Sequence, residues 1–364
     1  MNFQNRIIPL IISVLCMCNL QVTAQTNVVK VSAIKSNNYG IQYFLPKTIL
    51  EIEVEYHKTE RKAGVYAKYA SKYLGLNEQS VISEDLTDYA LDKIYVKDLS
   101  APNKNESYLV EFKVKTTAPF VYLTENGLIC TINADYPQPV INENKTETKN
   151  ATSSVSTINP QSVYTKEYMQ AGSVSKMAEI AAQQIYKIRE SRSDILTGEA
   201  ENAPKDGEAL KIVLANLEAQ EKVWTELFTG TSMTEKKTDK FQLEPISDLS
   251  KEILFRFSKH TGIVAADDLS GEPVYINISD LKTVDTEEIE PKRKGKESQG
   301  IVYNVPGTAS VEVFYSSNRM YKGEHLITQF GITRILANSL FEDKKLPVQI
   351  IFYPNTGAIK QIIQ

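Results

Sequence analysis

The residues of this chain that could carry out chemistry are scattered along the sequence. Its three histidines are His57, His260 and His325, and no second histidine or cysteine stands at ligand spacing from any of them. The sequence also lacks a Gly-rich phosphate loop and a Gly-x-Ser-x-Gly nucleophile elbow. Each histidine is therefore expected to be a surface or turn residue, and we predict neither a metal site nor a cofactor.

Two short patterns suggest chemistry, but each has a simpler structural explanation. Ser173 and Lys176 have the Ser-x-x-Lys spacing of serine acylases, yet the companion Ser-Asp-Asn and Lys-Thr-Gly elements are absent. A serine that caps the start of a helix is expected instead. Asp267, Asp268 and Glu272 lack the alternating ligand positions of a calcium loop, which favours a plain β-turn.

Charge limits the classes of partner. The chain has 41 Lys and Arg residues against 45 Asp and Glu residues, so its net charge is only −4 and spreads along the sequence. This balance gives no basic footprint for nucleic acid. The acidic side chains still offer many spatial pairs, so a hydrolase of envelope glycans with unknown catalytic residues stays open.

One charged cluster, Arg189, Glu190 and Arg192, is the candidate interaction site of the chain. It is either an ion-pair node that docks its helix on a lobe or a partner, or a solvated helix face. Ion pairs on a solvated face contribute under about 1 kcal/mol each. The sequence does not decide between these two interpretations.

A helical zone covers residues 161–230. Two apolar stripes with spacings of three and four residues run through residues 174–195 and 210–227. Gly198 and Gly230 each follow a threonine and are expected to end the helices in the left-handed conformation. Asp206 is the expected cap of the second helix. Two amphipathic helices joined by a short loop predict an antiparallel helical hairpin.

Segments rich in β-branched and aromatic residues flank this zone, at 25–140 and 231–364, and many alternate apolar with polar side chains. Asn126 and Gly127 predict a hairpin turn, and Cys130 is expected to be a buried structural thiol. The predicted fold class is therefore α+β, with two β-rich lobes flanking the helical hairpin. Residues 141–160, mostly Asn, Thr and Ser, predict a linker or exposed loop, and the charged residues 285–298 predict a solvated loop.

The two β-rich zones share a sequence pattern. Residues 40–56 and 300–315 follow the same order of residue types with one gap, and Pro46 and Pro306 occupy corresponding places. The turn at Gly127 likewise corresponds to the turn at Gly357. We interpret this pattern as an internal duplication, with chance reuse of Pro and Gly as the alternative.

The first 24 residues have the features of a secretory signal peptide. Arg6 precedes an apolar run at residues 7–20, and Val22 and Ala24 suit the pocket of a signal peptidase. A run of about 14 residues reaches roughly 21 Å, short of the roughly 30 Å hydrocarbon core, which disfavours a retained anchor. We expect cleavage after Ala24, a mature chain of about 340 residues without a transmembrane segment, and a place in the periplasm or on the cell surface.

Several segments of the chain resemble an uncharacterised family of exported proteins from Bacteroidetes. The resemblance rests on Arg189–Arg192, on the two Thr-Gly helix ends and on the Phe44–Thr48, Gln329–Gly331 and Asn355–Gly357 segments. It covers nearly the whole mature chain and implies location and fold, but it implies no activity.

These features together predict an exported cell-envelope protein with a non-catalytic binding or assembly role. Its partner is expected to be an envelope protein or glycan and not nucleic acid. The glycan hydrolase is one alternative, and a structural subunit of a larger envelope complex is another.

Overall fold

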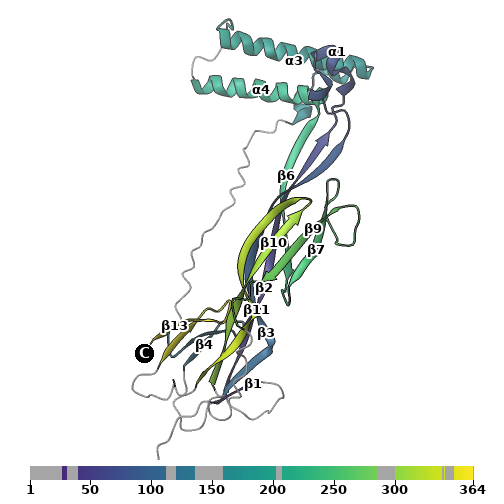
Figure 1. Cartoon of the computed structure of the whole chain (residues 1–364). Coiled ribbons are helices and arrows are strands. Elements are labelled where there is room, and N and C mark those ends of the chain that lie inside the picture. The colour runs from purple at the N-terminus through teal and green to yellow at the C-terminus, as the bar shows by residue number, and fades with distance from the viewer. Residues whose placement is uncertain are drawn as a thin grey trace, which may run out of the picture.

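The structure is a computed structural model that describes residues 27–30, 40–111, 120–135, 159–201, 207–285, 300–337, 340 and 348–363. In the part of the chain that it describes, three antiparallel sheets and a packed pair of helices form an elongated molecule (Figure 1). The helices lie at one end and the smallest sheet at the other, and no sheet closes into a barrel. The predicted α+β class is confirmed.

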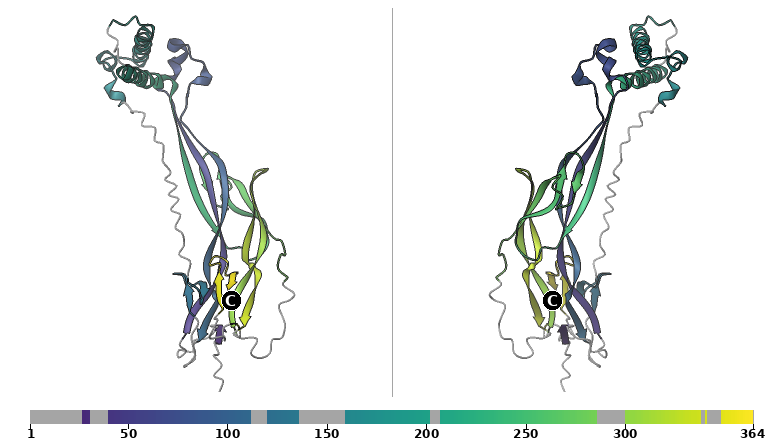
Figure 2. Two further views of the ribbon diagram at one scale, coloured as in Figure 1. Left: turned by 90° about the vertical axis from the view of Figure 1, so that its left-hand side faces the viewer. Right: turned by 90° about the vertical axis from the view of Figure 1, so that its right-hand side faces the viewer.

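The longest element is a hairpin that runs most of the length of the molecule. Its strands are β2 (Gly40–Lys62) and β3 (Leu86–Glu111), which pair from Gly40↔Glu111 to Arg61↔Leu86. β6 (Thr231–Leu243) pairs with the far half of β2, and β1 (Asn27–Lys30) pairs with the near end of β3. We call the three-stranded part that rises toward the helices, formed by β3, β2 and β6, the ladder (Figure 2).

A second sheet packs against the middle of this hairpin. Its strands are, in order, β11 (Asn318–Ala337), β10 (Gly300–Tyr315), β9 (Glu272–Asp280), β7 (Leu249–Ser258) and β8 (Gly262–Val264). Alternate residues of β2 and β10 point between the sheets, among them Ile52 and Val54 opposite Val311 and Val313, all fully buried. Burial of these aliphatic side chains stabilises the central core by about 1.5–3 kcal/mol per residue.

The third sheet forms the base of the molecule. Its order is β13 (Ile359–Ile363), β12 (Gln349–Phe352), β5 (Ile129–Ile132) and β4 (Val121–Leu123), so an N-terminal and a C-terminal hairpin meet at β5 and β12. Tyr43 crosses this basal core, and its hydroxyl accepts from Val302 N at 2.9 Å and donates to Val302 O at 3.1 Å. Both β-rich cores therefore mix residues from before and after the helical hairpin.

The helices form the head. α3 (Val174–Thr197) and α4 (Gly207–Thr229) pack antiparallel, and α1 (Ala70–Leu74) and α2 (Lys166–Met169) cover their end nearest the ladder. Trp224 is the centre of the head core, 1 % exposed and in ring contact with Tyr164 and Tyr168. The predicted helical hairpin is confirmed. No helix among the described residues is both long and apolar enough to span a bilayer.

The head joins the ladder at a narrow neck, where three chain segments cross. Gly64 N donates to Ile82 O at 3.2 Å, and Ile82 N donates to Thr229 O at 2.9 Å. A Cβ on Gly64 would lie 2.5 Å from Phe228 O, and one on Gly230 would lie 2.3 Å from Lys62 O. Two glycines thus permit the backbones to approach this closely.

The predicted stops and turns are largely confirmed. Gly198 and Gly230 adopt left-handed φ angles of 80° and 78° at the ends of α3 and α4, and Gly127 turns the β4–β5 hairpin with φ 77°. Cys130 is buried at 1 % exposure, as expected for a structural thiol.

Several predictions concern residues that the structure does not describe. These are Asp206, residues 141–158, residues 286–298, and the leader with its cleavage site. The predicted domain boundaries at 140 and 231 stay predictions.

Residues 40–56 and 300–315, the two segments with a shared sequence pattern, have some local structure in common. The strand pairing shifts register next to Pro46 in β2 and next to Pro306 in β10. Phe44 N donates to Gly127 O at 2.9 Å, and Asn304 N donates to Gly357 O at 3.2 Å. Duplication stays a prediction that these parallels motivate.

A row of charges covers the outer face of the ladder. Glu53 on β2 accepts from Lys97 Nζ at 2.7 Å, and Lys240 of β6 lies 3.8 Å away on the other side. The hydrogen bond from Lys97 lowers the pKa of Glu53 below its ordinary value, against the opposing effect of burial. The carboxylate is thus stabilised more in the folded than in the unfolded chain.

Glu53 predicts part of the acid sensitivity of the fold. Because its folded pKa is depressed, its stabilising effect is complete above the unfolded pKa, near 4.5, and is lost as pH falls through the folded value. Urea unfolding at pH 7 and pH 3 should therefore show a smaller loss of stability for Glu53→Gln than for the parent. Lys97→Met should reduce the loss similarly, and an unchanged acid dependence in both variants would contradict this account.

Candidate functional site

The predicted cluster lies on α3, and two of its members meet one carboxylate on α4. Arg189 Nε donates to Glu221 Oε1 at 2.6 Å, and Arg192 Nη1 lies 2.9 Å from Glu221 Oε2. The Glu221 side chain is only 14 % exposed, whereas Glu190 is exposed on the surface of α3. The two arginines thus form ion pairs between the helices, an arrangement that we call the clamp, and Glu190 is the member of the cluster that takes no part in it.

A shallow groove of about 310 Å³ runs beside this clamp along α4. Both arginines line it together with a row of polar and charged α4 residues, namely Glu218, Glu221, Lys222, Thr225, Glu226 and Thr229. Thr225 Oγ1 is buried and has no hydrogen-bond partner among the described residues. The groove therefore presents both signs of charge, which suits a polar protein surface better than a purely cationic or anionic ligand.

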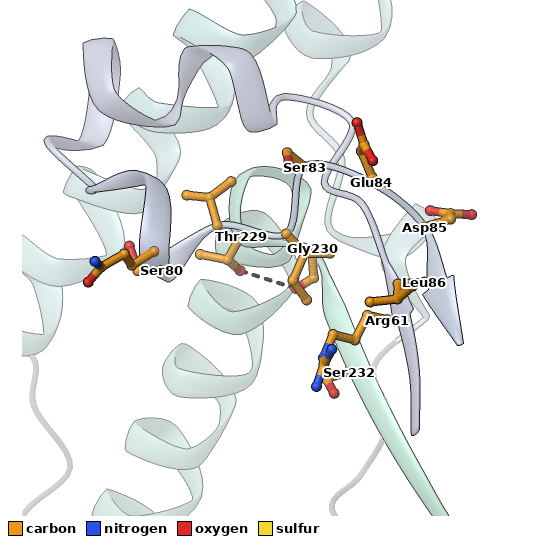
Figure 3. A pocket seen from close by; sticks show the side chains of 12 residues that line it. Arg61, Ser80, Ser83, Glu84, Asp85, Leu86, Thr229, Gly230 and Ser232 are labelled. Carbon is orange, nitrogen blue, oxygen red and sulfur yellow. Dashed lines mark hydrogen bonds between the residues drawn. The ribbon is translucent and has the colours of Figure 1, made fainter. Parts of the chain in front are cut away.

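A second hollow, of about 570 Å³, lies at the neck (Figure 3). Its wall is residues 79–86, which lead into the start of β3, and its floor is the turn from α4 into β6 at Gly230. Asp85 at its rim pairs with Lys62 at 2.9 Å and accepts from Ala63 N at 2.8 Å. These two bonds lower the pKa of the Asp85 carboxyl, the side chain of Lys62 having the larger effect.

His325 was expected on the surface or in a turn, and this expectation is wrong. It is 7 % exposed, between β11 and β3, with Nδ1 2.5 Å from Asp98 Oδ1 and Nε2 2.9 Å from Tyr321 Oη. Burial, with a smaller effect of the Asp98 charge, raises the pKa of Tyr321. A Cβ at position 323 would lie 2.3 Å from Tyr321 Oη, so Gly323 leaves room for the Tyr321 ring to lie beside His325.

The histidine has both ring nitrogens occupied within the protein, so this arrangement links the two large sheets. The sequence offered one weak signal for it, the spacing of four between Tyr321 and His325, which places both on one face of a strand. Asp98 lies 227 positions earlier, and only the fold brings it close.

The remaining sequence patterns have structural roles. Ser173 caps α3, and its hydroxyl accepts from Lys176 N at 3.2 Å. Asp268 lies in a turn, where its N donates to Ala265 O at 3.1 Å and its carboxylate accepts from Ser270 N. His57 pairs with Asp92 at 2.8 Å. Among the described residues, no group of three or more His, Cys, Asp or Glu side chains is placed to hold a metal ion.

Comparison with known proteins identifies a family but no activity. The model of a family described as a domain of unknown function, DUF4831, matches residues 39–360. No curated protein and no solved structure matches the chain. The match covers the head, the second sheet and most of the other two sheets, and it leaves out β1 and the last three residues of β13.

Proposed function

This chain belongs to the DUF4831 family, a domain of unknown function, and we propose that it is an exported cell-envelope protein. In this proposal it binds or assembles a partner without catalysis. The observation that carries the proposal is the position of the head. Two continuous strands and β6 hold it at the end of the ladder, away from both β-rich cores.

The surface of the head supports a role in protein contact. A buried apolar core packs α3 on α4, and the clamp adds two ion pairs between the helices. Charged side chains of both signs line the groove beside the clamp, and Glu190 is exposed elsewhere on the surface of α3. Surfaces of this kind favour specific pairing by charge complementarity, with gains mainly in association rate and selectivity.

The hollow at the neck is a poor candidate for hydrolysis of glycans. A glycosidase needs one carboxyl group with a raised pKa to act as general acid. The pKa of Asp85 is shifted downward, and Lys62 already occupies its carboxylate. The hollow at the neck therefore gives no support to the hydrolase alternative.

A site-specific crosslinking experiment tests the proposal. A photo-reactive residue at Glu190, expressed in the native host and activated in whole cells, should capture one reproducible envelope partner at the head. The matched control places the same residue at Leu269, which is 82 % exposed in the turn between β8 and β9. No reproducible adduct at Glu190, or the same adducts at both positions, would contradict a binding role of the head.

A further inference from the structure

The outer strand of the basal sheet has an open edge. β13 pairs with β12 through Gln349↔Ile363, Ile350↔Ile362 and Ile351↔Gln361, and within the described residues it has no strand on its other side. An unpaired strand edge presents a row of N–H and C=O groups that can pair with another chain. This edge is therefore a site of potential strand addition.

An aliphatic row leads across the sheet to this edge. Direct cross-strand pairs place Val121, Ile132, Ile350 and Ile362 side by side on one face, one residue from each of the four strands. Ile132 and Ile350 are fully buried, whereas Ile362 is 48 % exposed. The row thus ends in a half-covered isoleucine at the open edge, where one more aliphatic residue would complete its burial.

The edge lacks the features that usually prevent strand addition. Lysines on an edge strand are a common protection, and β6, an edge strand of the first sheet, carries Lys236, Lys237 and Lys240. The five residues of β13 include one charge, Lys360, which lies at the register shift with its ammonium 5.8 Å from the Tyr353 ring. Proline is absent from the strand.

We propose that two copies of this chain associate through β13, antiparallel, about a two-fold axis at Ile362. A closed two-fold interface must be self-complementary. Centring the strands on Ile362 places isoleucine opposite isoleucine and Gln361 opposite Ile363 of the second copy, so the aliphatic row continues through both molecules. In this register the two Lys360 side chains do not lie opposite each other. A second copy is favoured over an unrelated strand because it supplies this row at the matching position.

The size of the interface sets the strength of the association. One added strand pair buries less than the roughly 1,200 Å² of a stable complex, so the dimer is expected to be weak and concentration-dependent. This inference is independent of the proposed function, because the basal sheet and the head lie at opposite ends of the molecule.

Charge substitution at the axis tests the dimer. Sedimentation velocity from about 1 to 100 μM should show the parent passing from monomer to dimer, and like charges opposed across a strand pair should abolish this in Ile362→Lys and in Ile362→Glu. An equimolar mixture of the two variants should recover the dimer. Leu269→Lys, at an exposed position far from the edge, is the control and should associate like the parent.

The outcomes separate clearly. A parent that stays monomeric throughout, single variants that still associate, or a mixture that stays monomeric would each overturn the proposal. Thermal unfolding monitors whether each Ile362 variant is folded, and Ile362→Ala provides a milder variant with an expected several-fold weaker association. Crosslinking at Glu190 should not change in any of these variants, so failure of the dimer leaves the proposed role of the head intact.

Discussion

Gly230→Ala should destabilise the protein by about 3–5 kcal/mol, the largest single effect that we expect. Two costs combine at this position. An alanine there would have to keep a left-handed φ of 78°, which costs about 1–2 kcal/mol, and its Cβ would lie 2.3 Å from Lys62 O. Backbone of the neck must then move, so the head core should loosen with it. Urea unfolding and the fluorescence of Trp224, which is buried in that core, measure both effects.

Three other glycines separate the two costs. Gly64→Ala adds only the collision, 2.5 Å from Phe228 O, and should cost about 1–3 kcal/mol. Gly198→Ala adds only the strained φ, because nothing lies within 4 Å, and should cost about 1–2 kcal/mol. Gly172→Ala adds neither and should be nearly neutral. A loss at Gly230 no greater than that at Gly198 would show that the neck is not closely packed.

Gln329→Ala should destabilise the junction of the two large sheets by about 2–4 kcal/mol. The side-chain amide of Gln329 accepts from Thr48 N at 3.1 Å and donates to Thr48 O at 2.8 Å. β6 pairs with β2 only from Leu50 onward, so this amide takes the place of a neighbouring strand, together with Thr328 Oγ1, which also accepts from Thr48 N at 3.0 Å. Thr48 is 2 % exposed, and its carbonyl would lose a partner that water cannot readily replace.

Gln329→Glu provides a control of nearly equal shape. At neutral pH its carboxylate cannot donate to Thr48 O, so the variant should be destabilised, whereas a protonated carboxyl can donate. Its unfolding free energy relative to the parent should therefore recover as pH falls toward 4. A deficit that does not change with pH would show that the donated bond contributes little.

Local features of the sequence predicted the helices and turns well. The apolar stripes of α3 and α4 repeat every three to four residues and end at glycines, so residues close together in the sequence are enough to predict these helices and their ends. The turn at Gly127 is local in the same sense.

Strand pairing was not predictable from those features. β6 pairs with β2, where Lys240 contacts Glu51 from 189 positions later, and the alternation of either strand fits many partners. The burial of His325 and the partner of Arg189 depend on the same long-range geometry, since Asp98 and Glu221 give no local sign of their roles. The charged cluster was identifiable from composition, but its division into a clamp and an exposed Glu190 was not.

The mixing of early and late residues in both β-rich cores has a consequence for the order of folding. The hydrogen bonds of Tyr43 cannot form before Val302, 259 positions later, has been synthesised, and β5 cannot pair before β12 has been synthesised. The chain must lose the entropy of closing these long loops before the long-range contacts stabilise it, and this makes folding slow. An N-terminal fragment should therefore not reach a native state, and nascent chains should stay open to chaperones and proteases until the final strands emerge.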